Sequence, residues 1–204
     1  MTGSKGRFIT FDGPSGAGKS SLLCGVGELL REAGLRIHMT TEPSGSRLGQ
    51  FARECEEGLL NISLACLMAA DRYAHLSAEV VPALSEGKTV LSDRYVESSL
   101  VLQTLDGVDP EFIWALNSKI LIPDLSVVVI AGPETLSIRL SQRSRLTRFE
   151  RTIPRDEEVA AYEGVAQALS LRGFNVLLIE NDSTPLPTNV DRVLRQIRQL
   201  QQLQ

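Results

Sequence analysis

The residues with the clearest chemistry lie in a glycine-rich segment near the start of the chain. Residues 13–20 read GPSGAGKS and match G-x-x-x-x-G-K-[ST] at every fixed position, between an apolar run and a helical stretch. Glycines let backbone N–H groups turn inward around phosphate oxygens, and the N-terminus of the following helix adds partial positive charge. Lys19 would supply a mobile cation for the β- and γ-phosphates, and Ser20 an oxygen for Mg²⁺. The segment predicts a site for ATP or GTP.

Two segments typical of regulatory GTPases do not occur in the sequence. No Asn begins an N-K-x-D segment, which reads the guanine base, and no Asp begins a D-x-x-G switch segment. No signature segment of an ABC-type ATPase occurs either. The sequence therefore argues against a regulatory GTPase switch and against an ABC-type ATPase.

Arginines lie next to acids at two further places. Asp93 and Arg94 come directly after an expected strand, whose C-terminal end faces the ligand crevice in a doubly wound sheet. An Asp there can orient the water around Mg²⁺, and an Arg can bind a phosphate through two hydrogen bonds. Asp71 and Arg72 lie in an expected helix. The pattern leaves open a structural pair that caps the strand, and an ordinary ion pair on the helix surface.

Five arginines occur within residues 139–151, at the end of an expected helix and in the loop after it. Phosphoryl transfer is catalysed mainly by positioning and charge neutralisation. The cluster therefore predicts a short lid, about residues 143–153, that closes over the phosphoryl group and excludes water. A solvated charged face is the alternative interpretation.

The expected elements alternate between strand and helix, as in a parallel sheet covered on both faces. The apolar run at 127–130 has no polar alternation, which predicts a strand buried on both faces. The expected strands cover 7–12, 36–40, 88–92, 125–131 and 174–179. The expected helices cover 19–32, 62–84 with a bend at Pro82, 133–142, 154–172 and 189–201.

Composition limits the class of protein. The chain has 204 residues, 43% of them hydrophobic, and a formal net charge of −4. This balance predicts one α/β domain over residues 1–204 and argues against disorder, a coiled coil or a nucleic-acid partner. No apolar run approaches the roughly 20 residues of a membrane-spanning helix, so no membrane partner is expected. The three cysteines are widely separated, which predicts buried thiols in a reducing, cytoplasmic environment.

A series of short motifs occurs between about Phe8 and Glu150. They are F-D-G-x-x-G-A-G-K-S from Phe11, T-x-E-P-x-G from Thr40, A-A-D-R at 69–72, D-R-Y at 93–95, S-S-x-x-x-Q at 98–103, P-D-L at 123–125 and R-F-E at 148–150. Through these motifs the chain resembles the thymidylate kinase family of P-loop nucleoside monophosphate kinases. Their order and spacing make the match more specific than the phosphate loop alone.

The resemblance implies a P-loop NTPase fold with a five-stranded parallel sheet flanked by helices on both faces, a homodimer formed through helices, and ATP and Mg²⁺ as cofactors. ATP would be bound by Gly13, Pro14, Ser15, Gly16, Ala17, Gly18, Lys19, Ser20 and Ser21. Catalytic roles would fall to Lys19, Asp93, Arg94, Arg143, Arg145 and Arg148, with Ser20 and Asp93 at the metal. The acceptor, a nucleoside monophosphate, would be bound by Asp12, Glu42, Met68, Arg72, Arg94, Ser98 and Gln103.

The chain departs from the family pattern around the acceptor. Ser15 stands where members usually carry a carboxylate near the sugar hydroxyl, and Thr41 stands in place of an arginine. Met68 replaces a phenylalanine that stacks on thymine, and Leu102 replaces a tyrosine. The lid's D-R-F-E reads T-R-F-E, starting at Thr147. Because the departures gather on one side of the site, they are either tolerated drift or the mark of a shifted substrate.

The leading hypothesis is ATP-dependent phosphorylation of a deoxynucleoside monophosphate, dTMP to dTDP, with Arg47 as a candidate replacement for the missing arginine. The alternative is a kinase of the same fold that acts on a different or modified nucleotide or a small metabolite. A third hypothesis is a nucleotide-binding module without catalysis, against which Asp93, Arg94 and the lid arginines argue.

Overall fold

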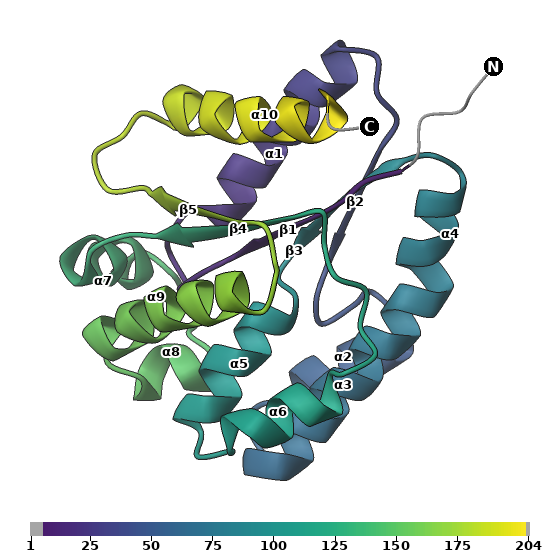
Figure 1. Ribbon diagram of the computed structural model, residues 1–204. Coiled ribbons are helices and arrows are strands. Elements are labelled where there is room, and N and C mark those ends of the chain that lie inside the picture. Colours follow the sequence, from purple (N-terminus) through teal and green to yellow (C-terminus); the bar gives the residue numbers. More distant parts are fainter. Residues whose placement is uncertain (1–5, 203–204) are drawn as a thin grey trace.

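A computed structural model describes residues 6–202 of the chain, with side chains up to residue 200. Its centre is a five-stranded, wholly parallel sheet, as expected (Figure 1). The strand order, which the sequence did not predict, is β2-β3-β1-β4-β5. The strands are β1 (Phe8–Asp12), β2 (Ile37–Thr41), β3 (Thr89–Asp93), β4 (Leu125–Ile130) and β5 (Val176–Glu180).

The three central strands are buried on both faces. Every residue of β1 and β4 is buried, whereas the edge strands β2 and β5 are partly exposed. The apolar run at 127–130 therefore lies where the sequence placed it, in a strand covered on both sides. The register pairs Phe11 of β1 with Asp93 of β3, so the carboxyl ends of both strands open at the same edge of the sheet.

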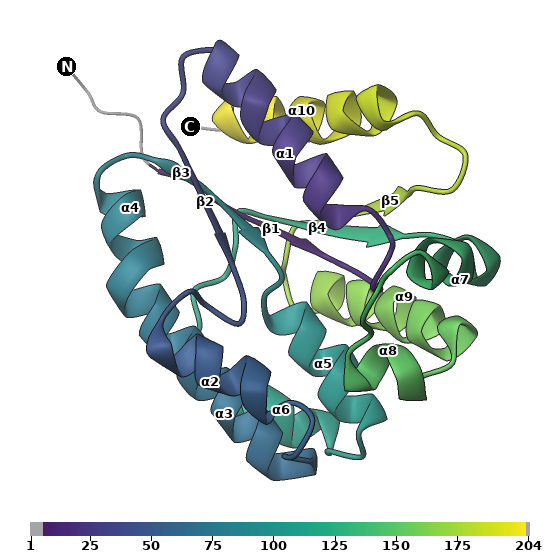
Figure 2. The same cartoon turned by 180° about the vertical axis from the view of Figure 1, so that it is seen from behind.

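Helices cover both faces of the sheet. Figure 1 shows α1 and α10 over one face, where Val26 and Val193 pack against Phe11 and Val127. On the other face, in both views, α5 lies between the α8–α9 pair and the α2–α3 pair (Figures 1 and 2). The helices are α1 (Lys19–Glu32), α2 (Arg47–Cys55), α3 (Asn61–His75), α4 (Val81–Ser85), α5 (Val96–Leu105), α6 (Pro110–Leu116), α7 (Pro133–Ser141), α8 (Arg148–Thr152), α9 (Arg155–Leu171) and α10 (Leu186–Gln202). None of the described helices is both long and apolar enough to cross a membrane.

The long helix predicted over 62–84 is divided. After α3, residues Leu76–Val80 form a π-helical turn, and α4 then begins with Pro82 in its first turn. Proline lacks an N–H, so it fits the first turn of a helix, where that group has no partner anyway. The last helix begins at Leu186, three residues before the prediction.

The prediction of buried thiols is wrong for two of the three cysteines. Cys24 and Cys66 are exposed and Cys55 is intermediate, and all three are free. Cys24 lies on α1 and Cys66 on α3, each on a side of its helix that faces solvent.

Four short helices were missed from the sequence: α2, α5, α6 and α8. Helix α5 is buried on most sides, so its apolar residues show no helical stripe. Helix α8 did carry a signal, because Thr147 and Glu150 form a capping box at its start. The segment predicted as a lid, residues 143–153, is a short loop followed by α8, and the capping box stabilises the point at which the loop becomes helix.

Candidate active site

The phosphate loop connects β1 to α1, and its shape depends on glycine at two ends. Gly13 has a φ of +142°, and a Cβ there would lie 1.9 Å from the carbonyl oxygen of Val129. Gly18 has a φ of +95° and is the N-cap of α1. Both conformations are strained for any residue with a side chain. The loop can therefore turn tightly around the N-terminus of α1, where backbone N–H groups are available to an anion.

Lys19 is buried and folds back over the loop. Its Nζ donates to the carbonyl oxygens of Gly13 at 2.9 Å and Pro14 at 2.8 Å. Burial and the positive charge of Arg94 lower the pKa of Lys19 to about 7, despite the carboxylates of Asp93 and Asp12. A phosphate group would replace the two carbonyls as its partner and favour its charged form.

Ser20 and Asp93 meet at the C-terminal end of β3. The Ser20 hydroxyl donates to Oδ2 of Asp93 at 2.5 Å. No group of three or more His, Cys, Asp or Glu side chains within the described residues could hold a metal alone. Mg²⁺ is commonly held by one or two protein oxygens together with substrate phosphates, so this pair of oxygen donors fits such an ion.

A cavity of about 540 Å³ opens beside the phosphate loop. Two of its residues were missed in the sequence: Asn181 donates to the carbonyl oxygen of Ala17 at 2.7 Å, and Arg139 donates to that of Gly16 at 3.1 Å. Arg139 is on α7 and Asn181 follows β5, so hydrogen bonds from distant parts of the chain stabilise the phosphate loop. The lining residues are Gly16, Gly18, Lys19, Ser20, Ser21, Arg139, Arg143, Asn181, Thr184 and Leu186.

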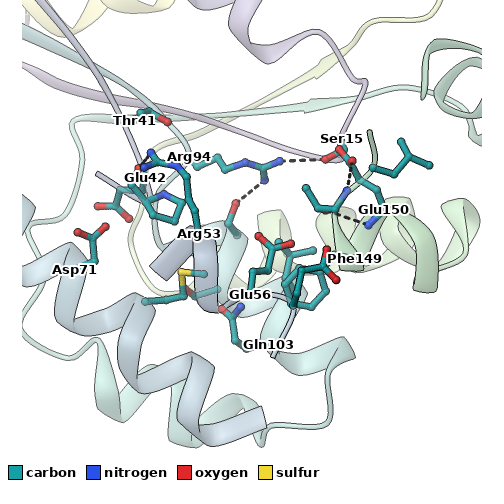
Figure 3. A pocket seen from close by; sticks show the side chains of 18 of the residues that line it. Ser15, Thr41, Glu42, Arg53, Glu56, Asp71, Arg94, Gln103, Phe149 and Glu150 are labelled. Atoms are coloured by element: carbon teal, nitrogen blue, oxygen red, sulfur yellow. Dashed lines mark hydrogen bonds between the residues drawn. The ribbon is translucent and has the colours of Figure 1, made fainter. Parts of the chain in front are cut away.

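A second cavity, of about 630 Å³, lies between α2, α3, α5, α9 and the lid (Figure 3). It contains six of the seven residues predicted to bind the acceptor: Glu42, Met68, Arg72, Arg94, Ser98 and Gln103. Arg143 lines both this cavity and the one beside the phosphate loop. The two cavities are therefore neighbours that share a lid arginine.

Arg94 connects the phosphate loop to the second cavity. It has a φ of +75°, and its guanidinium donates to Ser98 Oγ at 2.9 Å and to Ser15 Oγ at 3.2 Å (Figure 3). Burial opposes its charge, but the neighbouring acidic groups Tyr162 and Asp12 hold the pKa of Arg94 above its usual value. The side chain is a fixed cation in the wall of the second cavity, in contact with Ser15 of the phosphate loop, and a guanidinium held in this way is suited to bind a phosphate group.

Asp12 was predicted to bind the acceptor nucleotide, but in the described structure it does not line the second cavity. It is completely buried, and its carboxylate accepts from the N–H groups of Gly13 and Tyr95 at 2.9 Å and from the hydroxyl of Tyr162 at 3.1 Å. It also accepts from Ser98 Oγ at 2.7 Å. Asp12 thus connects the phosphate loop, the start of α5 and α9 beneath the site.

Asp71 and Arg72 do not form the surface ion pair that the sequence left open. Both are buried, and Arg72 binds Glu42 at 2.8 Å and Asn117 at 2.6 Å. His75, one turn further along α3, contacts the same Glu42 at 3.2 Å. Asp71 instead accepts from Ser44, through the backbone N–H and the hydroxyl, each at 2.6 Å. This network fixes Arg72 and Glu42 at the wall of the cavity.

Two buried oxygens in the second cavity have no hydrogen-bond partner among the described residues. They are Oε1 of Gln103 and Oε1 of Glu56, and Figure 3 shows both side chains in the cavity. Burial raises the pKa of the Glu56 carboxyl, against the influence of the Thr147 hydroxyl and the charge of Arg94. A buried acceptor without a partner is costly, so these atoms favour a ligand that brings hydrogen-bond donors.

The lid arginines separate into two groups. Arg143 is half exposed, binds Glu150 at 2.5 Å and lines both cavities, and Arg145 lines the second cavity. Arg148 instead binds Asp106 at 2.5 and 3.1 Å and the carbonyl oxygen of Glu56 at 2.9 Å. In the described structure Arg148 lines neither cavity, so its geometry supports a structural role rather than the predicted catalytic one.

The missing arginine at position 41 has a different candidate from the predicted one. Thr41 is exposed and donates to the carbonyl oxygen of Asp93 at 3.0 Å. Arg47 is exposed at the start of α2 and is not part of the described cavity lining. Arg53, one and a half turns later, does line the cavity and donates to the carbonyl oxygens of Pro43 and Ser44. No sequence signal pointed to Arg53, because α2 was not predicted and a spacing of six residues does not put Arg53 on the same helix face as Arg47.

Comparison with known proteins identifies the family. A family model described as thymidylate kinase matches residues 11–161. The chain is 38% identical to the probable thymidylate kinase of Caldivirga maquilingensis, over 71% of this chain and 72% of that protein. The chain belongs to the thymidylate kinase family. It is 36% identical to the thymidylate kinase of Caldicellulosiruptor saccharolyticus, over 72% and 75% of the two chains. It is 33% identical to the probable thymidylate kinase of Pyrococcus horikoshii, over 76% and 80%.

Membership of the thymidylate kinase family confirms the predicted resemblance and makes the protein a phosphotransferase. The observed parallel sheet and its phosphate loop agree with the P-loop fold of such a kinase. The matched segment, residues 11–161, contains the phosphate loop, the end of β3 and residues 143–153, the segment predicted to form a lid.

Proposed function

We propose that the protein transfers the γ-phosphoryl group of ATP to dTMP, giving dTDP and ADP. The observation that carries the proposal is the pair of neighbouring cavities. One lies beside the phosphate loop, the other between the helices, and Arg143 lines both. ATP is placed in the cavity of about 540 Å³ and the acceptor in the cavity of about 630 Å³. The names of the related kinases support ATP-dependent phosphorylation of thymidylate.

The proposed chemistry is an in-line phosphoryl transfer. An oxygen of the acceptor phosphate forms a bond to the γ-phosphorus of ATP, the bond from that phosphorus to the β–γ bridging oxygen breaks, and ADP leaves with the electron pair. Lys19 and the loop N–H groups bind the ATP phosphates, and Arg94 binds the acceptor phosphate. Arg143 and Arg145 neutralise charge that develops between the two substrates. Ser20 and Asp93 would hold Mg²⁺, which would supply positive charge to offset that of the phosphates.

Recognition of the acceptor base is assigned to the inner part of the second cavity. Arg72 donates to Glu42, Asn117, the carbonyl oxygen of Tyr95 and the hydroxyl of Ser99. Among the described residues, these four bonds leave one N–H of Nη1 to donate to a ligand. The amide of Gln103 faces the same cavity, and Met68 supplies apolar contact. Ser98 positions Arg94 through its hydroxyl.

The test is acceptor-dependent ADP release from Mg²⁺-ATP across a panel of nucleoside monophosphates led by dTMP. Turnover with dTMP well above the background ATPase rate is expected. ATP binding without acceptor-dependent ADP release from any member of the panel would contradict the proposal.

A second candidate function is phosphorylation of a different or modified nucleotide by the same chemistry. The unpartnered carboxyl oxygen of Glu56 favours it, because thymine would bring few donors to that wall of the cavity. A strong preference in the same panel for a base with an amino or hydroxyl substituent would select this candidate over dTMP.

The proposal treats residues 1–204 as one cytoplasmic kinase domain that works as a homodimer. Exposed apolar side chains on α2 and α3, such as Phe51 and Ile62, support a contact with a second copy through these helices. Free cysteines support a reducing compartment. Light scattering after gel filtration would test the dimer, and a monomeric mass would contradict it.

A further inference from the structure

A carboxylate from a distant helix lies against the phosphate loop at Ser15. Glu158 is on α9, 143 positions later in the chain, and only 4% of it is exposed. Its Oε1 accepts from the backbone N–H of Ser15 at 3.3 Å. Ser15 is the position at which the family usually has a carboxylate of its own. The structure therefore brings an acid to this place from a different element.

Glu158 is held at the wall of the acceptor cavity. Its second carboxyl oxygen binds Arg155, one turn earlier on α9, at 2.8 Å. Arg94 binds the hydroxyl of Ser15 at 3.2 Å, so Glu158 and Arg94 contact two atoms of one residue. Burial raises the pKa of the Glu158 carboxyl, whereas Arg155, the Ser15 N–H and Arg94 favour its charged form.

The other described carboxylates of this cavity that make hydrogen bonds are engaged elsewhere. Glu42 binds Arg72 and His75, Asp71 binds Ser44, Glu150 binds Arg143 and the N–H of Thr147, and Glu57 binds Arg151. Within the described hydrogen bonds, Glu158 is the cavity carboxylate that touches the phosphate loop. It contacts the backbone of Ser15, the residue whose hydroxyl accepts from Arg94.

We propose that Glu158 accepts a hydrogen bond from the sugar hydroxyl of the acceptor nucleotide. The inference rests on the proposed function, which puts the acceptor phosphate on Arg94. The sugar is the next unit of a nucleotide after its phosphate, so it lies within reach of a carboxylate that shares Ser15 with that arginine. In a 2′-deoxynucleotide the sugar has a single hydroxyl, at the 3′ position. A charged acceptor gives such a hydroxyl a strong hydrogen bond.

The small side chain of Ser15 is part of the same arrangement. A carboxylate at position 15 would place a second negative charge beside Glu158, and both would compete for Arg94. Ser15 instead offers Arg94 a neutral acceptor and leaves its backbone N–H to Glu158. In this arrangement the carboxylate for the sugar hydroxyl comes from position 158 on α9, and position 15 carries a small neutral side chain instead.

The test compares two acceptors in two proteins. We would measure kcat/KM for dTMP and for its 3′-deoxy analogue with the wild-type protein and with Glu158→Gln. The wild type should prefer dTMP by about tenfold or more, and the variant should lose most of this preference, because a site built for a hydroxyl penalises its absence. Glu163→Gln, an exposed acid on the same helix, is the matched control and should keep the wild-type preference.

A preference for dTMP that is equal in wild type and Glu158→Gln would overturn the inference, as would a wild type that does not distinguish the two acceptors. Either result leaves the proposed function intact, since both require turnover. Absence of turnover with every nucleoside monophosphate would instead reject the proposed function, and the inference with it.

A double variant keeps the test decisive if Glu158→Gln does not fold. Ser15→Asp combined with Glu158→Ala moves the carboxylate to the phosphate loop. If the carboxylate acts on the sugar, this protein should regain the preference for the 3′-hydroxyl over the 3′-deoxy acceptor. Turnover without that preference would contradict the inference.

Discussion

The two halves of the site are built in different ways. The proposed ATP side depends on residues 13–21, a continuous segment around Lys19. The proposed acceptor side draws Glu42, Arg72, Arg94 and Gln103 from four separate segments of the chain. Phosphates present the same oxygens in every nucleotide, so a local loop suffices for them. Recognition of a sugar and a base needs side chains that converge from several directions.

This difference explains why substitutions gather on the acceptor side. A group lost from one element can be replaced by a group from another, provided that it reaches the same place. Glu158 approaches Ser15, and Arg53 enters the cavity that lacks an arginine at position 41. The phosphate loop has no such freedom, because Gly13 and Gly18 hold conformations that other residues avoid.

The largest effect should come from the ATP side. Lys19→Ala removes the cation at the phosphates and should lower kcat by about 10³-fold or more, with the melting temperature retained. Steady-state ADP release and thermal unfolding measure the two quantities. Lys119→Ala, at an exposed position, should leave both unchanged. Full activity of Lys19→Ala would remove the phosphate loop from the mechanism.

The lid arginines should separate chemistry from structure. Arg143→Ala should lower kcat by about 10²-fold, because Arg143 lines both cavities. Its side chain is half exposed, so the free energy of unfolding should change little. Arg148→Ala should instead lower the free energy of unfolding by about 1–3 kcal/mol, because it removes a largely buried ion pair with Asp106. Equal losses of kcat at unchanged stability in both variants would restore the catalytic role predicted for Arg148.

Two arginines on α2 offer a matched comparison on the acceptor side. Arg53→Ala should raise KM for the acceptor by about tenfold or more, because the side chain lines the acceptor cavity. Arg47→Ala removes the same charge from an exposed position and should leave KM unchanged. A larger effect at Arg47 than at Arg53 would show that the missing arginine is replaced as the sequence suggested.

The smallest effect concerns the proton on Lys19. Without ATP the pKa of Lys19 is about 7, so its amino group is largely protonated below pH 7 and loses its charge above pH 7. Since ATP phosphates favour the charged form, ATP affinity should be constant below pH 7 and fall by up to about tenfold per pH unit above it. Calorimetry in two buffers of different ionisation enthalpy should detect proton uptake on binding at pH 8. No uptake at that pH would contradict the lowered pKa.

The ATP side and most of the sheet could be predicted because their signals are local. The G-x-x-x-x-G-K-S segment and the apolar run at 127–130 each indicate their structure within a few residues. The acceptor side could be predicted only where the family motifs named a residue. The contact of Glu158 with Ser15 joins residues 143 positions apart, and the sequence around neither residue predicts it. Arg148 lay in a plausible motif, but its partner Asp106 comes from the end of α5, a helix without a visible stripe.

The most direct test of the account is the quantity of each product formed from dTMP and Mg²⁺-ATP. Chromatographic measurement of ADP and dTDP in the same reaction should give a ratio of one to one, because the two cavities bring both phosphates together and exclude water as the acceptor. ADP that forms without dTDP would contradict the account, because the phosphoryl group would then have gone to water or to another acceptor.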